Sequence, residues 1–162
     1  MILIALGANL PSAAGGPEET LRAALASLRA RGITVERQSG FYVSEAWPVP
    51  SDPPFVNAVA AVRTSLAPTD LLRLLHEVEA EFGRKRGPRN APRSLDLDLI
   101  DYDSRVEQGE PELPHPRVES RAFVLVPLRE IAPDWRHPVT GRAVTELIAD
   151  LPNAQVTPLP RR

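Results

Sequence analysis

The segment 94–100, Ser-Leu-Asp-Leu-Asp-Leu-Ile, constrains the fold of this chain more than any other. Leucine and aspartate alternate in it, and side chains alternate between the two faces of a β-strand. The segment therefore predicts a strand that buries its leucines and carries Asp96 and Asp98 on the opposite face, roughly 7 Å apart. The fold must bury one face of this strand and leave two carboxylates side by side on the other.

Five cationic side chains lie in the ten residues before this strand: Arg84, Lys85, Arg86, Arg89 and Arg93. Guanidinium groups bind phosphate oxygens in pairs, and magnesium takes a few carboxylate oxygens together with waters and substrate phosphates. Either feature alone is also typical of a solvent-facing edge strand or a solvated loop. Together they favour a ligand site, because paired carboxylates repel unless cations offset them. Magnesium-bound ATP is the obvious candidate.

Hydrophobic periodicity along the chain predicts alternating strands and helices before this site. The expected elements are strands at 2–6, 33–43 and 55–63, a helix from Pro17 to about Gly32, and a second helix from Pro68. With the strand at 94–100, the order is strand, helix, strand, strand, helix, strand. This order is typical of a ferredoxin-like split βαβ sandwich, so we expect an α+β fold with helices packed on an antiparallel sheet.

The remainder predicts a C-terminal helical extension within a single domain that spans residues 1–162. After a polar segment at 106–116, Ser120 is positioned to cap a helix that runs toward Ile131. A turn at 137–142 and a short helix at 144–151 should follow. We expect the tail from Pro152 to be loosely held.

Composition narrows the function classes. The chain has no cysteine, which excludes disulfides and thiolate chemistry, and its net charge of −2 argues against a general nucleic-acid binder. No basic leader precedes the first apolar run, and no segment is long enough to cross a bilayer, so we expect a cytoplasmic protein without a membrane partner. Neither common glycine-rich nucleotide-binding loop is present, so nucleotide binding must depend on side chains.

Several ordered blocks resemble 6-hydroxymethyl-7,8-dihydropterin pyrophosphokinase, an enzyme family of folate biosynthesis. The blocks are Gly-Ala-Asn-Leu at 7–10, Phe-Tyr-Val-Ser at 41–44, Phe-Val-Asn-Ala at 55–58, Pro-Arg-Ser-Leu-Asp-Leu-Asp at 92–98, Leu-Pro-His-Pro at 113–116 and Arg-Ala-Phe-Val-Leu-Val-Pro-Leu at 121–128. The resemblance implies transfer of diphosphate from ATP to the hydroxymethyl group of the reduced pterin, with release of AMP. It also implies two magnesium ions held by Asp96 and Asp98.

The resemblance assigns further roles residue by residue. It implies that the catalytic residues are Arg84, Arg93, Asp96 and Asp98. The residues it places at the nucleotide are His76, Glu79, Arg84, Arg86, Arg93, Leu99 and His115. The residues it places at the pterin are Gly7, Ser44, Trp47, Phe55, Asn57, Asp96, Arg121 and Phe123. Loop 87–92 departs from the family because it lacks the tryptophan that many members carry there.

A second class of function stays open at this point. Split βαβ sheets also serve as RNA-binding or small-ligand regulatory modules, and a fold does not fix a function. An RNA-binding sheet needs exposed aromatic residues on its central strands, whereas the strand at 94–100 carries acids that repel phosphate. We therefore favour the pyrophosphokinase, with ATP and the pterin as partners, and expect a monomer.

Overall fold

The computed structural model describes residues 1–44, 53–83, 94–152 and 155–160. Within this described part, one antiparallel sheet contains the strands β1 (Ile2–Ala8), β2 (Thr34–Gln38), β3 (Tyr42–Ser44), β4 (Phe55–Arg63), β5 (Asp96–Tyr102) and β6 (Val156–Pro158). The helices are α1 (Pro17–Ala30), α2 (Pro68–Glu81), α3 (Ala122–Ile131), α4 (Val144–Ala149) and the 3₁₀ helix η1 (Val118–Ser120). The class is α+β, as the sequence predicts.

The strand order is β5-β1-β4-β3-β6, and β2 also pairs with β4. Strand β1 pairs with both β4 and β5, so β4 separates β1 from β2, and β1 separates β4 from β5. The chain therefore makes two split βαβ units, β1-α1-β2 and β4-α2-β5. This arrangement confirms the ferredoxin-like topology and leaves β5 at one edge of the sheet.

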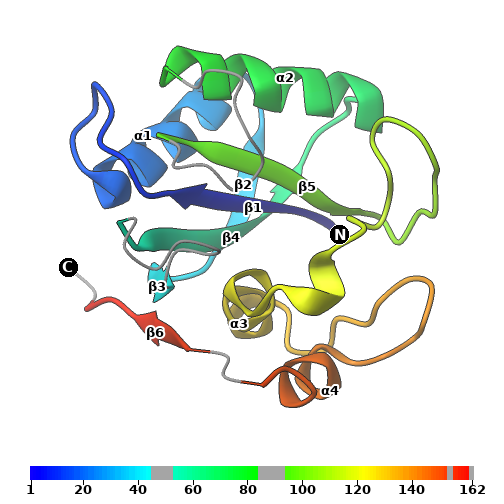
Figure 1. The fold of residues 1–162 in the computed structure, drawn as a ribbon. Helices are drawn as coiled ribbons and strands as arrows, with labels where there is room; N and C mark the ends of the chain where they lie inside the picture. Colours follow the sequence, from blue (N-terminus) through cyan, green and yellow to red (C-terminus); the bar gives the residue numbers. More distant parts are fainter. Residues whose placement is uncertain (45–52, 84–93, 153–154, 161–162) are drawn as a thin grey trace.

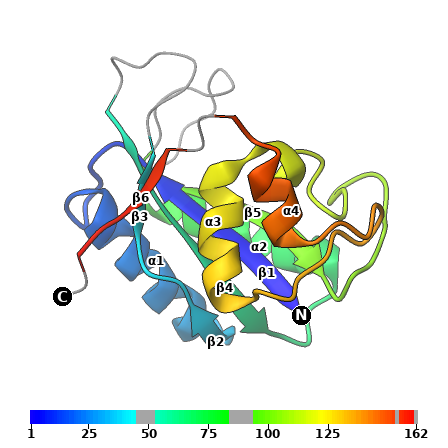
Figure 2. The ribbon, with the colours of Figure 1, turned by 90° about the horizontal axis from the view of Figure 1, so that it is seen from below.

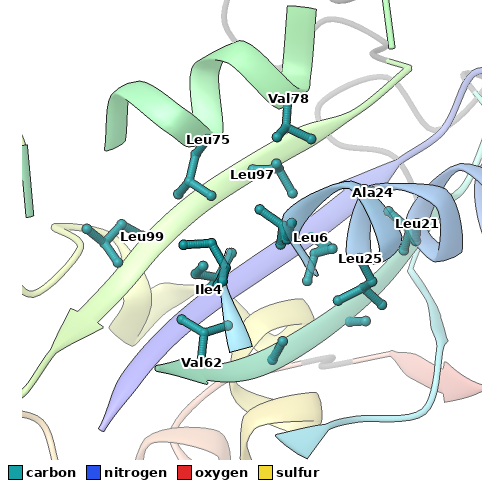
Figure 3. Close-up of a cluster of buried hydrophobic side chains, with 14 of the residues drawn as sticks. Ile4, Leu6, Leu21, Ala24, Leu25, Val62, Leu75, Val78, Leu97 and Leu99 are labelled. Carbon is teal, nitrogen blue, oxygen red and sulfur yellow. The ribbon is translucent and has the colours of Figure 1, made fainter. Parts of the chain in front are cut away.

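Helices cover both faces of the sheet (Figure 1). Helices α1 and α2 pack on one face, where Leu6 and Leu97 meet Leu25, Leu75 and their neighbours (Figure 3). Helices α3 and α4 pack on the other face, around a second buried cluster. The C-terminal helical extension is therefore the third layer of the sandwich, and it lies on the same side of the sheet as the acidic face of β5.

Helices α1 and α2 begin as the sequence predicts, each with a proline in its first turn. Glu18, Glu19 and Asp70 occupy the first turns, where a carboxylate interacts favourably with the helix dipole. Each of the two helices is 14 residues long.

Among the residues that the structure describes, no helix combines the length and the hydropathy that a membrane crossing requires.

The single strand expected at 33–43 is wrong, because the structure divides it into β2 and β3. Between them, the hydroxyl of Ser39 accepts a hydrogen bond from the backbone N–H of Val59 at 2.9 Å, in place of a backbone carbonyl. The N–H of Gly40 points away from β4 and donates to the carboxylate of Glu130 on α3, at 3.0 Å. Five residues on this side, from Gln38 to Tyr42, oppose four on β4, so the break acts as a bulge.

Two expectations for the C-terminal part also need correction. Ser120 does not cap α3; it lies in η1 and its hydroxyl donates to the carbonyl of Arg117 at 3.1 Å, while Arg121 occupies the cap position. The tail is not loosely held throughout, because β6 pairs with β3, where Val156 is opposite Ser44. The edge of β3 provides the backbone hydrogen-bond partners of β6, and the local sequence of the tail does not predict this pairing.

Candidate active site

Four residues form a row across the sheet at one end of β5. The register places Asp96 opposite Gly7, Gly7 opposite Asn57, and Asn57 opposite Tyr42. Side chains directly opposite each other in a sheet share a face, and here it is the face covered further along by α3. Because Gly7 has no side chain, none separates the carboxylate of Asp96 from the amide of Asn57 in this row.

Asp98 lies one step along the same face and has two basic neighbours. The Nη1 atom of Arg121 is 3.3 Å from Oδ2 of Asp98, and the Nε2 atom of His115 is 3.9 Å from Oδ1. The side chains of Asp98 and Arg121 are 29% and 18% exposed, so the pair is partly shielded from water but still accessible. The sequence placed Asp98, His115 and Arg121 at one site through the resemblance, and the structure brings all three together.

One tight turn, residues 115–121, carries both basic groups. The N–H of His115 donates to the carbonyl of Ile100 on β5 at 2.9 Å, and its Nδ1 accepts from the N–H of Arg117 at 3.2 Å. Because Nδ1 is an acceptor, the proton of the neutral ring is on Nε2, which faces Asp98. The buried side chain of Val118 fixes the middle of the turn in the second core cluster. Asp98 thus has a basic side chain beside it from each end of the turn, and Arg121 donates a hydrogen bond to it.

Three of the residues predicted for the pterin, Ser44, Phe55 and Asn57, lie beside Gly7. The Nδ2 atom of Asn57 donates to the hydroxyl of Ser44 at 2.7 Å, and both side chains are buried. This bond orients the amide and points Oδ1 of Asn57 toward Gly7, where a Cβ would lie 3.3 Å away. The ring of Phe55 flanks the same position, 3.9 Å from that Cβ. The arrangement is a small floor with a polar amide edge and an aromatic neighbour.

Phe123 stands at the beginning of α3, beside the acidic face. It is one of the few large apolar side chains exposed to solvent among the described residues, and the guanidinium carbon of Arg121 lies 5.5 Å from its ring centre. A partly exposed aromatic ring near a planar cation is typical of a surface that stacks a flat ligand. Figure 2 shows α3 crossing the sheet on this side.

The predicted nucleotide residues on α2 occupy a different position, along the outer edge of β5. Glu79 is buried, at 3% exposure, and its Oε2 accepts a hydrogen bond from the N–H of Leu97 at 2.8 Å. His76, one turn earlier on α2, is exposed. The side chain of Leu99 is in the core beneath α2, so only its backbone is available to a ligand. By the two-residue repeat, that backbone faces the same outer edge as Leu97.

Several predicted residues lie outside the described part of the chain. These are Trp47 in the loop before β4 and Arg84, Arg86 and Arg93 in the basic loop before β5. In the sequence, the basic segment lies between α2, which ends at Glu81, and β5, which begins at Asp96. The roles predicted for these four residues stay predictions.

The donor set of β5 fits a magnesium ion shared with a ligand. Asp96 and Asp98 offer hard oxygen donors on one face, and both are partly exposed. In the described ranges, no group of three or more histidine, cysteine, aspartate or glutamate side chains could enclose a metal. Magnesium bound by one or two carboxylates completes its octahedron with waters and phosphate oxygens. Two carboxylates therefore suit a metal that arrives with a polyphosphate.

Asp101 is a buried acid of β5 for which sequence reasoning gave no role. Its carboxylate is 2% exposed and accepts hydrogen bonds from Nε1 of Trp135 at 2.8 Å and from the N–H of Ser104 at 2.9 Å. A bulge shifts the β1–β5 register between Leu3 and Ile4, and it turns Asp101 to the α3 side. Strict alternation would have put this acid in the core with Leu97 and Leu99. A charged residue at a core position conflicts with the strand pattern, and this conflict is the sequence signal that could have predicted the bulge.

The site combines acidic and basic side chains that suit a metal-bound polyphosphate with an amide and aromatic rings that suit a flat ligand. Comparisons with known proteins identify the family. Residues 3–133 match the family model described as 7,8-dihydro-6-hydroxymethylpterin-pyrophosphokinase (HPPK). The chain therefore belongs to this family, and it is a diphosphotransferase enzyme of folate biosynthesis. Family membership decides against the RNA-binding or regulatory alternative.

Individual relatives agree with the family model. The chain is 42% identical to a 2-amino-4-hydroxy-6-hydroxymethyldihydropteridine pyrophosphokinase of Synechocystis sp. over 97% of this chain and 79% of that one. It is 39% identical to the enzyme of the same name from Pseudomonas aeruginosa, over 98% and 96% of the two chains. A crystal structure of an HPPK-DHPS in complex with substrates has a TM-score of 0.69 and 11% identity, which supports the fold. The match covers 91% of this chain and 42% of that longer one.

Proposed function

We propose that this chain transfers the terminal diphosphate of ATP to the hydroxymethyl group of 6-hydroxymethyl-7,8-dihydropterin at the acidic face of β5, and releases AMP. The observation that carries this proposal is the row Asp96–Gly7–Asn57, which places a carboxylate and an amide edge on either side of a residue that has no side chain. The hydroxymethyl group of a pterin held against Asn57 would then lie beside the carboxylates that face the phosphates.

Asp96 and Asp98 would hold two magnesium ions, which when bound neutralise phosphate charge and align the oxygens of the transferred group. The chain's own contribution is orientation and charge. Arg121 would hold the carboxylate of Asp98 with His115 beside it, and Arg84 and Arg93 would contact the phosphates. Phosphoryl-type transfer needs little covalent help from the protein, so positioning and electrostatic stabilisation supply most of the catalysis.

The nucleotide would lie along the outer edge of β5, between α2 and the turn 115–121. The exposed ring of His76, the backbone of Leu99 and the loop residue Arg86 would bind it there, with His115 next to the phosphates. Glu79 would act at this edge by holding the strand, since its carboxylate is bonded to the amide of Leu97.

The pterin would occupy the floor over Gly7. The ring would stack between Phe55 and Phe123, and its amide edge would bond to Asn57, whose orientation Ser44 fixes. Trp47 and Arg121 would complete the contacts. We also propose that residues 1–162 form one domain that acts as a monomer in the cytoplasm, where a chain without cysteine suits the reducing conditions.

The direct test is AMP release from ATP with and without the pterin alcohol, using Asp98→Ala and Asp98→Asn. We expect the native protein to release AMP only with the pterin and magnesium, and both variants to lose nearly all turnover while thermal unfolding shows that they fold. Asp103→Asn is the matched control. Asp103 is an exposed acid that follows the same strand, and its carboxylate pairs with the N-terminal amine. Near-native turnover of the Asp98 variants would refute the assignment.

A further inference from the structure

A chain of contacts outside the proposed site starts on β5 and runs through the C-terminal layer. It begins at Asp101, three residues after Asp98, where Oδ2 accepts the hydrogen bond from Nε1 of Trp135. The ring of Trp135 then packs edge to face against the ring of His137, with the centroids 6.0 Å apart. The contacts thus lead from the metal-binding strand to a buried histidine that the proposed reaction does not use.

Both ring nitrogen atoms of His137 have close partners. Nδ1 accepts from the N–H groups of Val139 at 3.1 Å and Thr140 at 3.2 Å, so the proton of the neutral ring is on Nε2. Nε2, which carries that proton, lies 3.1 Å from Oε1 of Glu119. The side chain of His137 is only 8% exposed, so this donor has a fixed direction, whereas Glu119 is 43% exposed.

Glu119 belongs to η1, in the middle of the turn 115–121. Its neighbour Val118 is buried, and the N–H of Arg121 bonds back to the carbonyl of Val118 at 3.3 Å. A displacement of Glu119 would therefore be passed to both ends of the turn, where His115 and Arg121 face Asp98. The contacts therefore form a continuous path that leaves β5 at Asp101 and returns to it at Asp98 through Arg121.

We propose that His137 is a positioning residue for the metal and nucleotide site: through Glu119 it holds the turn 115–121 in the orientation that directs Arg121 and His115 at Asp98. This inference rests on the metal-binding role proposed above for Asp98. Groups that bond directly to a metal ligand typically change metal affinity 10–100-fold when they are replaced. Because His137 and Glu119 act on Asp98 only through the turn, we expect the lower end, about tenfold.

Two substitutions separate this role from simple support of the fold. His137→Asn keeps an acceptor near the position of Nδ1 for the turn at 137–140 but is too short to reach Glu119. His137→Gln keeps a donor near the position of Nε2 for Glu119 but loses the acceptor for that turn. If His137 only supports the fold, the less stable variant should also bind the metal–nucleotide complex more weakly. If His137 positions the turn through Glu119, the asparagine variant should bind more weakly whichever variant is the less stable.

The experiment measures two properties in purified full-length protein. Calorimetry gives the affinity for the manganese complex of a non-hydrolysable ATP analogue, and NMR of the ligand-free, metal-free protein follows the guanidinium signal of Arg121 and the ring signals of His115. The variants are His137→Asn, His137→Gln, Glu119→Ala and the double variant His137→Asn/Glu119→Ala. Glu112→Ala is the control, since it removes an exposed carboxylate from the preceding loop.

We expect His137→Asn and Glu119→Ala to weaken binding about tenfold each, to shift the signals of Arg121 and His115, and to have no additive effect when combined. Native affinity with native signals in both variants would overturn the proposal, as would losses that follow unfolding temperature alone. If the histidine variants do not fold, Glu119→Ala decides alone. If the native chain does not bind the manganese complex, the proposed function fails, and the ligand-free signals still test the positioning.

Discussion

Replacing Glu79 tests whether this buried acid stabilises the strand that carries the proposed metal ligands. Strand β5 lies at an edge of the sheet, and the N–H of Leu97 points to its open side, where no neighbouring strand can accept its hydrogen bond. The carboxylate of Glu79 accepts a hydrogen bond from it at 2.8 Å in a buried environment. The side chain thus replaces a neighbouring strand at the point between Asp96 and Asp98.

The expected free energies follow from this bond. Glu79→Ala leaves the buried amide of Leu97 without this acceptor, which costs about 1–3 kcal/mol, and removes one buried methylene, about 0.8 kcal/mol. The sum is about 2–4 kcal/mol of unfolding free energy. Glu79→Gln keeps an oxygen acceptor and the methylene, so at this bond it should cost at most about 1 kcal/mol, the difference between charged and neutral acceptors. The two variants should therefore differ by about 1–3 kcal/mol.

Urea unfolding of both variants measures this difference, and hydrogen exchange at the amide of Leu97 locates it. We expect exchange at Leu97 to be much faster in Glu79→Ala than in Glu79→Gln. Equal stabilities with unchanged exchange at Leu97 would refute the reasoning. The KM for ATP of the folded glutamine variant separately tests the nucleotide contact that the family resemblance implies for Glu79, because that variant largely keeps the strand in place.

Other regions give predictions of their own. Gly7→Ala puts a Cβ 3.3 Å from Oδ1 of Asn57, so the KM for the pterin should rise at least roughly tenfold with that for ATP unchanged, since one methyl group in a fitted pocket has this effect. The hydrogen bond from Arg31 lowers the pKa of Glu81 from its ordinary value of 4.5. This acid therefore stabilises the fold above pH 4.5 and loses that contribution as the pH falls through its lowered pKa. When the free energy of unfolding in urea is plotted against pH, it should fall slightly less on the acid side of pH 4.5 in Glu81→Gln than in the native protein, and identical curves would contradict this. Removing residues 153–162 deletes β6, so steady-state kinetics should show a higher KM for the pterin; an unchanged value would show that β3 needs no partner there.

Local periodicity predicted the parts of the fold that depend on local pattern. The alternation in 94–100 placed Leu97 in the core and both Asp96 and Asp98 on the other face, because strand geometry alone decides which way each side chain points. The stripe that includes Leu75 predicted α2 in the same way. The identity of the face that carries the acids, and hence their nearness to Asn57, required the order of the strands.

Features that depend on distant partners were not accessible from the sequence. The division of the expected strand at 33–43 depends on Glu130, which is about ninety residues away and binds the N–H of Gly40. The strand β6 forms because β3 has an open edge, and neither segment shows this alone. The contact between His137 and Glu119 belongs to the same class, since a turn and a 3₁₀ helix come together only when the third layer packs.

The bulge in β5 explains how neighbouring acids on one face can have different environments. It turns Asp101 to the side of Asp98, where Trp135 buries it and ties β5 to the C-terminal layer. Asp98 lies nearer the beginning of α3 and stays partly exposed beside Arg121, which leaves it accessible to a ligand. Without the extra residue, Asp101 would face the leucine core, where an ionised carboxylate is strongly disfavoured. Placing Asp101 in the C-terminal layer fixes the strand close to the acids that must stay open, and a rigid strand is what precise metal geometry requires.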